Sequence, residues 1–294
     1  YGAFARRWWE LAVPEPLPAP PSLRAPSSLP EAGVIPHETS DVPLPKAGED
    51  AALARLETFV GEKLDDYATR RDRLDGSGLS RLSIDFTLGT LSPRVAFHRV
   101  SAHGGDGAKK WLAELLWRDF LADLLAQRPW LATRAFDARF DALQWSDDEA
   151  AFAAWRDGRT GIPAVDAAMR QLNATGWISN RARMIAAQFL TKHLRIHWAK
   201  GEAVFRHMLL DGDAASNIGN WQWAAGLGVD NAPYFRVFNP VTQAGQHDPD
   251  GRWLEQWVPE CGGDPRPMAG AIVDLAEARR DYLEWVKGSA RPGS

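Results

Sequence analysis

Apolar residues recur every three or four positions along most of the chain, and this spacing restricts the possible fold more than any other feature. The pattern is typical of helices that bury one face. Runs in which apolar and polar residues alternate, as they would in a half-buried strand, are scarce. We therefore expect residues 49–294 to form an essentially all-α domain. Its first helix presents an apolar face made by Leu53, Leu56, Val60, Leu64 and Tyr67.

Local signals indicate where several of these helices begin and end. Ser92 followed by Pro93 has the pattern of a helix N-cap and first helical residue. Gly176 is expected to end the helix that precedes it. Glycine-rich stretches at 76–78 and 211–233 are expected to be irregular connections. Further helices are expected at residues 111–120, 184–198, 204–210 and 274–286.

Residues 1–48 differ from the rest of the chain. Ten prolines lie between positions 14 and 45, and proline inside a helix removes a hydrogen bond and clashes with the preceding turn. We expect this proline-rich segment to cross a surface in an extended form, as a tether. Its first residues include Phe4, Trp8 and Trp9, whose rings we expect to pack against other parts of the protein.

The charge balance restricts the function. The net charge is −4, which argues against indiscriminate binding of nucleic acid but allows a local basic groove. Between Trp177 and Gly201 the chain has basic residues and no acidic ones, which indicates either an anion-binding surface or chance clustering. The basic residues of this stretch are Arg181, Arg183, Lys192, Arg195 and Lys200.

Other features exclude whole classes of protein. No run of about 18 apolar residues is present, so no membrane-spanning helix is expected. The single cysteine, Cys261, excludes an internal disulfide framework and indicates a reducing, cytoplasmic compartment. His193 and His197 lack a third ligand nearby, so we expect no metal site. The 14 tryptophans exceed what packing alone usually requires, and we expect stacking or redox roles for some of them.

Three short patterns could carry chemistry, and each also has an ordinary structural explanation. The loop Gly76–Ser83 could hold phosphate oxygens or be a common Gly/Ser connection. Asp211 and Asp213 could bind a metal, move a proton or accept hydrogen bonds, or could simply flank the end and start of helices. One helix face carries two indoles, a carboxylate and a guanidinium, which suit a nucleobase or belong to an ordinary packed helix. This face is made by Trp111, Glu114, Trp117 and Arg118.

Several longer motifs are far more specific than these patterns. They are SRLS at 80–83, LSPR at 91–94, GIPAVDAAMRQL at 161–172, TGWISNRARM at 175–184, DGD at 211–213, GNWQW at 219–223 and APYFRVFNP at 232–240. Together they resemble the photolyase/cryptochrome family, from Tyr67 to Lys287 without large gaps. Within the family, the chain is most similar to class I photolyases that act on cyclobutane pyrimidine dimers.

The resemblance implies that residues 49–294 are the helical, FAD-binding catalytic domain of such a protein. The N-terminal α/β domain that carries the light-harvesting antenna in this family is absent from the chain, so the antenna chromophore stays unassigned. Residues 1–48 resemble the inter-domain connection. The α/β domain is therefore an expected partner, in the same chain or as a separate one, and we expect a monomer.

The resemblance also assigns FAD contacts. Asn217 matches the position beside flavin N5, where a neutral amide helps to keep reduced FAD anionic and plant cryptochromes carry aspartate. Arg183 matches the partner of Asp211. The family usually has threonine where Leu79 stands, so one hydroxyl contact is missing. The implied cofactor contacts are Tyr67, Ser80, Arg81, Leu82, Ser83, Trp111, Arg118, Arg183, Asp211, Asp213 and Asn217.

Positions for damaged DNA follow from the same motifs. Asn180 and Met184 match the pocket for the cyclobutane dimer, where enzymes acting on the (6-4) photoproduct carry histidines. Glu114 matches a residue that hydrogen-bonds a thymine carbonyl, and Trp117 and Trp223 match stacking walls for the flipped bases. The implied DNA contacts are Arg71, Arg118, Arg181 and Gln243, and the implied electron-transfer chain of indoles is Trp221, Trp198 and Trp145.

The resemblance thus implies an enzyme that repairs cyclobutane pyrimidine dimers in ultraviolet-damaged DNA with light, by electron transfer from excited, reduced, anionic FAD to a flipped dimer. The first alternative is a cryptochrome-type blue-light photoreceptor without repair activity, against which Asn180, Met184 and Asn217 argue. The second is a helical DNA-binding module that has lost its cofactor, for which Leu79 gives slight support.

Overall fold

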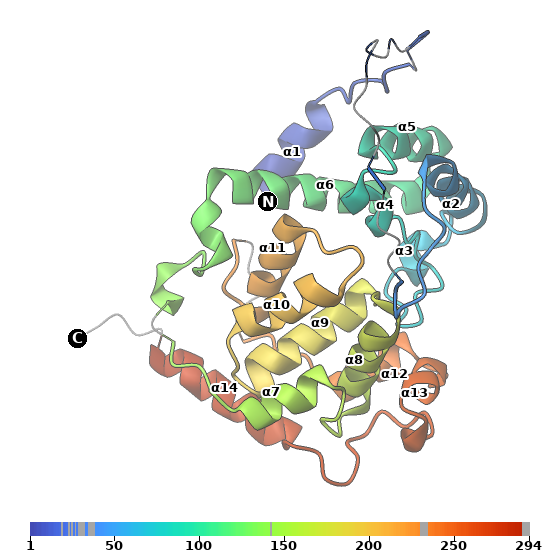
Figure 1. Cartoon of the computed structure of the whole chain (residues 1–294). Helices are drawn as coiled ribbons and strands as arrows, with labels where there is room; N and C mark the ends of the chain where they lie inside the picture. The colour runs from blue at the N-terminus through green and yellow to red at the C-terminus, as the bar shows by residue number, and fades with distance from the viewer. Residues whose placement is uncertain are drawn as a thin grey trace.

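The protein is helical throughout its core, as the spacing of apolar residues predicts (Figure 1). The computed structural model describes residues 1–18, 20–22, 24, 26, 28, 33–34, 39–141, 143–229 and 235–289. These residues form no β-strand, and their only β-type pairing is an isolated bridge between Ser146 and Ile196. Residues 230–234, which include part of the APYFRVFNP motif, lie outside the described residues, as do Pro30 and Pro36.

Fourteen α-helices fall within the described ranges. They are α1 (Gly2–Glu10), α2 (Glu49–Glu62), α3 (Tyr67–Arg70), α4 (Ser83–Leu88), α5 (Pro93–His103), α6 (Gly105–Gln127), α7 (Glu149–Arg156), α8 (Pro163–Thr175), α9 (Asn180–Gln188), α10 (Trp198–Met208), α11 (Ala214–Ala225), α12 (Pro240–His247), α13 (Arg252–Trp257) and α14 (Leu275–Ser289). None of them is long and apolar enough to cross a membrane.

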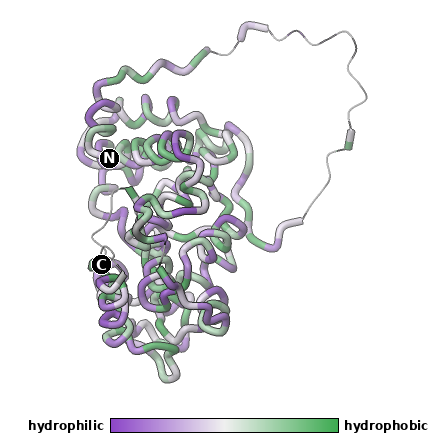
Figure 2. The backbone as a smooth tube through the Cα atoms, turned by 90° about the vertical axis from the view of Figure 1, so that its left-hand side faces the viewer, coloured by the Kyte–Doolittle hydropathy of each residue, from purple (hydrophilic) through white to green (hydrophobic). Residues whose placement is uncertain are grey.

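The longest helix, α6, joins two parts of the hydrophobic core. Its first half contributes Trp111 and Leu115 to a cluster with α2, α3 and α5. Its second half contributes Phe120 and Leu124 to a smaller cluster that also contains Phe4 of α1. A third and larger cluster holds α8, α9, α10, α11 and α14 together on the other side of α6 (Figure 1). Along the helices, hydrophobic and hydrophilic residues alternate in bands, as one buried face per helix requires (Figure 2).

Several predicted helix ends are confirmed because they depend on local chemistry. The Ser92 side chain accepts a hydrogen bond from the backbone N–H of Arg94 and caps α5, with Pro93 as the first helical residue. Gly176 ends α8 in the left-handed conformation, with φ of 64°. The predicted C-terminal helix at 274–286 corresponds to α14.

The single helix predicted at 184–198 is wrong. Helix α9 ends at Gln188 and continues as one π-helical turn, Phe189–His193. Arg195 then takes a left-handed backbone conformation with φ of 54°, and its carbonyl accepts a hydrogen bond from the Ser146 backbone N–H at 2.7 Å. The break is therefore fixed by a residue about 50 positions away, and α10 starts after it.

The irregular connection predicted at 211–233 is also wrong over most of its described length, because α11 occupies residues 214–225. Its glycine, Gly219, has low helix propensity. The absence of a side chain there allows Leu121 of α6 to approach, since a Cβ atom would lie 2.5 Å from a Leu121 methyl carbon. Packing between helices outweighs propensity at this position.

The beginning of the proline-rich segment is helical rather than extended. Helix α1 lies against α6, with the Trp8 indole N–H donating to Asp119 at 2.9 Å and Phe4 packing on Phe120. The expected packing is confirmed for Phe4 and Trp8, whereas Trp9 is 49% exposed and contacts the Trp8 ring of its own helix. The division of the chain at residue 48 stays a prediction.

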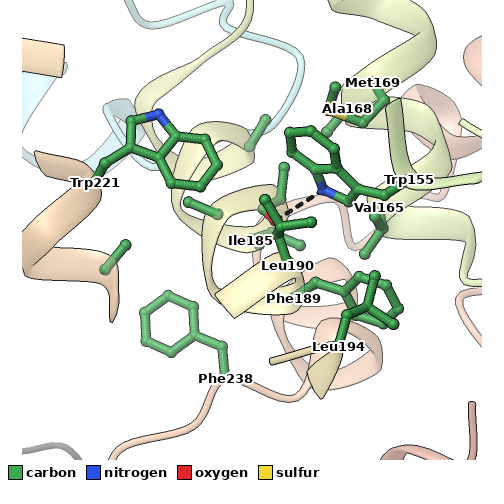
Figure 3. Close-up of a cluster of buried hydrophobic side chains, with 14 of the residues drawn as sticks. Trp155, Val165, Ala168, Met169, Ile185, Phe189, Leu190, Leu194, Trp221 and Phe238 are labelled. Carbon is green, nitrogen blue, oxygen red and sulfur yellow. Dashed lines mark hydrogen bonds between the residues drawn. The ribbon is translucent and has the colours of Figure 1, made fainter. Parts of the chain in front are cut away.

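The largest core cluster contains buried indoles as well as aliphatic side chains (Figure 3). Trp155 is fully buried and its indole N–H donates to the Ala186 carbonyl at 3.0 Å. Trp221 of α11 lies against Gly201 of α10 so closely that a Cβ atom on Gly201 would be 2.2 Å from the Trp221 ring and 2.5 Å from Leu190. No side chain larger than that of glycine fits without displacing the rigid indole.

Replacing Gly201 by alanine should therefore overpack this core and lower the free energy of unfolding by about 1–3 kcal/mol. Urea unfolding followed by circular dichroism measures the change. Gly245 of α12 has open space around its Cα, so Gly245→Ala should be neutral or stabilise by up to about 1 kcal/mol. Equal stability of the two variants would contradict the overpacking argument.

Candidate functional site

A cavity of about 930 Å³ lies where α6, α9, α11 and the loop before α4 meet. All of the cofactor contacts that the sequence motifs imply line this cavity, and so do all of the implied substrate contacts except Gln243. Of the three indoles proposed for electron transfer, only Trp221 reaches its wall. The cavity is large enough to hold a ligand of cofactor size.

The loop at one end of the cavity has a strained backbone. Arg81 takes a left-handed conformation, with φ of 57°, which is uncommon for residues other than glycine. Its guanidinium lies 4.3 Å from the centre of the Trp177 ring, a stacking contact that helps to hold the turn. The Ser80 hydroxyl accepts a hydrogen bond from the Trp111 indole N–H at 3.3 Å. Helix α6, through Trp111, and the connection between α8 and α9, through Trp177, thus fix the position of the SRLS motif.

The two aspartates of the DGD motif have different local roles. Both Asp211 oxygens accept hydrogen bonds from the Arg183 guanidinium, at 3.0 and 2.8 Å, and the Asp211 side chain is almost fully buried. This pairing was implied by the motifs. The Asp213 carboxylate accepts a hydrogen bond from the Ser216 N–H at 2.7 Å and caps α11. The capping explanation is therefore correct for Asp213, which also lines the cavity.

Asn217 is held by a residue that the sequence did not single out. Its amide nitrogen donates to the carbonyl and to the carboxylate of Glu202, at 3.0 and 2.9 Å. Glu202 is buried and pairs with Arg206 one turn later in α10, at 3.0 Å. Because both donor contacts of the amide point to Glu202, the other edge of Asn217 is available to the cavity. The only sequence signal for Glu202 is a common i,i+4 charge pair.

Charged residues at the rim of the cavity form a connected series. Glu114 of α6 pairs with Arg71. The Asp72 carboxylate lies 2.9 Å from the guanidinium of Arg181 on α9. The same guanidinium donates a hydrogen bond to the side-chain amide oxygen of Gln243 at 3.1 Å. Residues expected to contact DNA or a base therefore contact one another in the free protein. Asp72, which the sequence motifs did not indicate, links them.

Tyr67 lies beneath this rim. The phenol is buried, and its pKa is raised by burial first and then by the Glu114 carboxylate. It therefore stays protonated over the physiological range and can serve as a hydrogen-bond donor. The Arg71 guanidinium lies 5.7 Å from the centre of its ring.

One aromatic wall of the cavity is covered by the first residue of the described chain. Tyr1 stacks on Trp117 with ring centroids 3.8 Å apart and an interplanar angle of 6°. Trp223 of α11 also lines the cavity. On α9, the Asn180 amide lies 3.8 Å from the Met184 sulfur, so these two side chains share one part of the wall.

The indoles proposed for electron transfer run from the cavity toward the surface. Trp221 is buried, and its indole N–H has no hydrogen-bond partner among the described residues. Trp198 begins α10, one turn before Gly201, on which Trp221 packs. The His197 ring lies between the last two indoles, with centroids 5.6 Å from Trp198 and 5.1 Å from Trp145.

The basic stretch between Trp177 and Gly201 is not one surface. Arg181 and Arg183 reach the cavity, whereas Lys192 is fully buried and donates to the Arg236 carbonyl at 2.9 Å. Burial, with the nearby Arg236 charge, lowers the pKa of Lys192 to about 7. Lys200 pairs with Glu149 at 2.6 Å. Only part of the cluster can therefore face an anion in the cavity. No group of three His, Cys, Asp or Glu side chains within the described part of the chain could hold a metal ion.

Comparisons with known proteins agree with this geometry. Residues 111–287 match the family described as the FAD binding domain of DNA photolyase. The chain is 57% identical to a deoxyribodipyrimidine photo-lyase of Thermus thermophilus over 99% of its own length and 68% of the relative, and 43% identical to that of Escherichia coli over 87% and 55%.

Solved structures give the same result. A class III photolyase from Agrobacterium tumefaciens superposes with a TM-score of 0.90 at 35% identity, covering 98% of this chain and 68% of that one. A cryptochrome from Synechocystis superposes with a TM-score of 0.74 at 33% identity, covering 81% and 56%. With a matching family model, close relatives and an FAD-sized cavity lined by the family's motif residues, this chain belongs to the DNA photolyase family.

Proposed function

We propose that the chain is the catalytic part of an enzyme that repairs cyclobutane pyrimidine dimers in ultraviolet-damaged DNA with light. The observation that carries the proposal is that one cavity brings together the SRLS loop, Asn217 and the Glu114–Trp117 face of α6. The names of the relatives, deoxyribodipyrimidine photo-lyases, support the same reaction. Asn180 and Met184 on the cavity wall support a cyclobutane dimer as the substrate.

The residues of the cavity fit FAD. Hydroxyl, arginine and backbone groups of the loop at 80–83 gather at one end and suit a diphosphate, which carries negative charge. Asp211 and Asp213 line the cavity from the start of α11. The indole N–H of Trp221, which has no hydrogen-bond partner among the described residues, is a buried polar group at the cavity wall. When bound, reduced FAD supplies one electron to the dimer on absorbing blue light and recovers it after the ring opens.

Asn217 has a defined task in this arrangement. Its amide carries no ionisable proton, so it cannot transfer one to the cofactor. Glu202 fixes the orientation of the amide by accepting from its nitrogen twice. An amide at 217 would therefore leave a reduced flavin bound in the cavity with its negative charge, which favours repair over the photoreceptor alternative.

The rim and the aromatic walls receive the damaged bases. Trp117 and Trp223 offer flat apolar faces, and stacking on such faces contributes about 1–3 kcal/mol per base. Tyr1 occupies the Trp117 face in the free protein and must move aside for a base to stack there. Glu114 must leave Arg71 and act as the neutral acid, because only a protonated carboxyl can donate a hydrogen bond to a thymine carbonyl and stabilise the negative charge that develops there as the dimer opens.

Changing Glu114 to alanine should lower the repair yield per absorbed photon by about tenfold, the effect of losing one hydrogen bond to a charged group. Glu114→Gln, which keeps a hydrogen-bonding group, should fall between this variant and the unmodified protein. The measurement is dimer loss from an oligonucleotide under blue illumination, with FAD absorbance as the check on cofactor retention. Undiminished repair by Glu114→Ala would remove this residue from the mechanism.

Replacing Trp221 by phenylalanine should abolish light-driven reduction of oxidised FAD and spare repair by chemically reduced protein, because only the first process needs an indole donor at the cavity wall. Absorbance of oxidised FAD during illumination reports the reduction. The partly exposed Trp130 serves as the control, and Trp130→Phe should reduce its FAD normally. Normal photoreduction in Trp221→Phe would exclude Trp221 as the primary donor.

Changing Asn217 to aspartate should place a second carboxyl group beside Glu202, which raises the pKa of the pair. The protonated acid could then give its proton to the one-electron-reduced cofactor. We expect the absorption spectrum during photoreduction to change to that of the protonated cofactor. If the spectrum of the variant matches that of the unmodified protein, the amide at 217 does not control the charge of the cofactor.

A further inference from the structure

Asp72 lies between two arginines at the rim of the cavity. One of its carboxylate oxygens, Oδ1, is 2.9 Å from Arg181 Nη2 and 4.0 Å from Arg71 Nε. The arginine side chains are mostly buried, each 16% exposed, whereas the Asp72 side chain is 40% exposed. The carboxylate is thus the part of this cluster that faces solvent.

The remaining contacts of both arginines are internal. Arg71 pairs with Glu114 through Nη1. Arg181 donates from Nη1 to Gln243, and its Nε is buried without a partner among the described residues. Two carboxylates therefore balance two guanidinium groups, and this part of the rim has no net charge. These four residues gain a net positive charge only when one of the two carboxylates moves away.

The Asp72 carboxylate occupies the place beside the Arg181 guanidinium that a bound anion would take. Guanidinium groups bind carboxylate and phosphate oxygens with the same geometry. A DNA phosphate that approaches Arg181 from solvent must displace the Asp72 carboxylate. We propose that Asp72 competes with a DNA phosphate for Arg181, and that this competition lowers binding to undamaged DNA more than binding to DNA that holds a dimer. The proposal rests on the function proposed above.

The selectivity arises from the shared partner, Arg71. On undamaged DNA no base enters the cavity, so Glu114 keeps neutralising Arg71, and a displaced Asp72 retains only its long contact with Arg71 Nε. On damaged DNA, Glu114 turns to the base and frees Arg71, whose Nε is already within 4.0 Å of Asp72. Asp72 can then move from Arg181 to Arg71 with little loss. The free-energy cost of replacing Asp72 by a DNA phosphate at Arg181 is therefore lower when the dimer is in the cavity.

The test is the dark binding affinity of FAD-loaded protein for two labelled duplexes that differ only by one cyclobutane thymine dimer. Asp72→Asn should tighten binding to the undamaged duplex by about twofold to fivefold, the range expected for one partly exposed ion pair. Binding to the dimer duplex should tighten less, so the ratio of the two affinities should fall. The salt dependence on undamaged DNA should steepen, by up to about 0.9 in logarithmic slope for one added phosphate contact.

A matched control removes the same charge elsewhere. Glu57 pairs with Arg99 on the exposed surface of α2 and α5, at 2.5 Å and outside the cavity, and Glu57→Gln should leave both affinities unchanged. An Asp72→Asn protein with unchanged or weaker binding to undamaged DNA, or with equal tightening on both duplexes, overturns the proposal. If the unmodified protein itself shows no preference for the dimer duplex, the proposed function fails instead.

Discussion

The fold depends on α6 packing into two separate core clusters. Its first half is held by α2, α3 and α5, and its second half by α1 and by residues near α11. Between these contacts the helix lies along the cavity and presents Glu114 and Trp117 to it. Helix α6 is anchored at both ends, and the helices around it are close-packed against each other. For this reason α6 can line a cavity of this size without moving into it.

The chemistry of the site follows from how its polar groups are paired. Deep in the cavity the pairs are fixed and buried, as in Arg183 with Asp211 and Asn217 with Glu202. At the rim the carboxylates paired with Arg71 and Arg181 are more exposed, at 36% for Glu114 and 40% for Asp72, and these pairs can exchange partners. Fixed pairs suit a permanently bound cofactor, since leaving any member unpaired would be costly. Exchangeable pairs suit a substrate that arrives and leaves, since exposed ion pairs contribute little stability.

Much of the fold could be predicted from the sequence where the signals were local. The N-cap at Ser92 and the left-handed Gly176 depend on their immediate neighbours, and both were predicted correctly. The left-handed Arg195 before α10 is held by a hydrogen bond from distant Ser146, and α11 packs against α6 through the fit of Gly219. In the site, motif resemblance identified residues that line the cavity, but Asp72 and Glu202 act through contacts between distant segments. Spacing along the chain contains no information on such contacts.

The loop that contains Arg81 has a consequence for the lifetime of the complex with FAD. A left-handed turn held by its own side chain against Trp177 is preshaped, so the loop has little freedom to open by itself. A preshaped loop loses little conformational entropy when it takes up a diphosphate. Little of the free energy of FAD binding should therefore be spent on ordering the loop, which favours slow dissociation of the pigment.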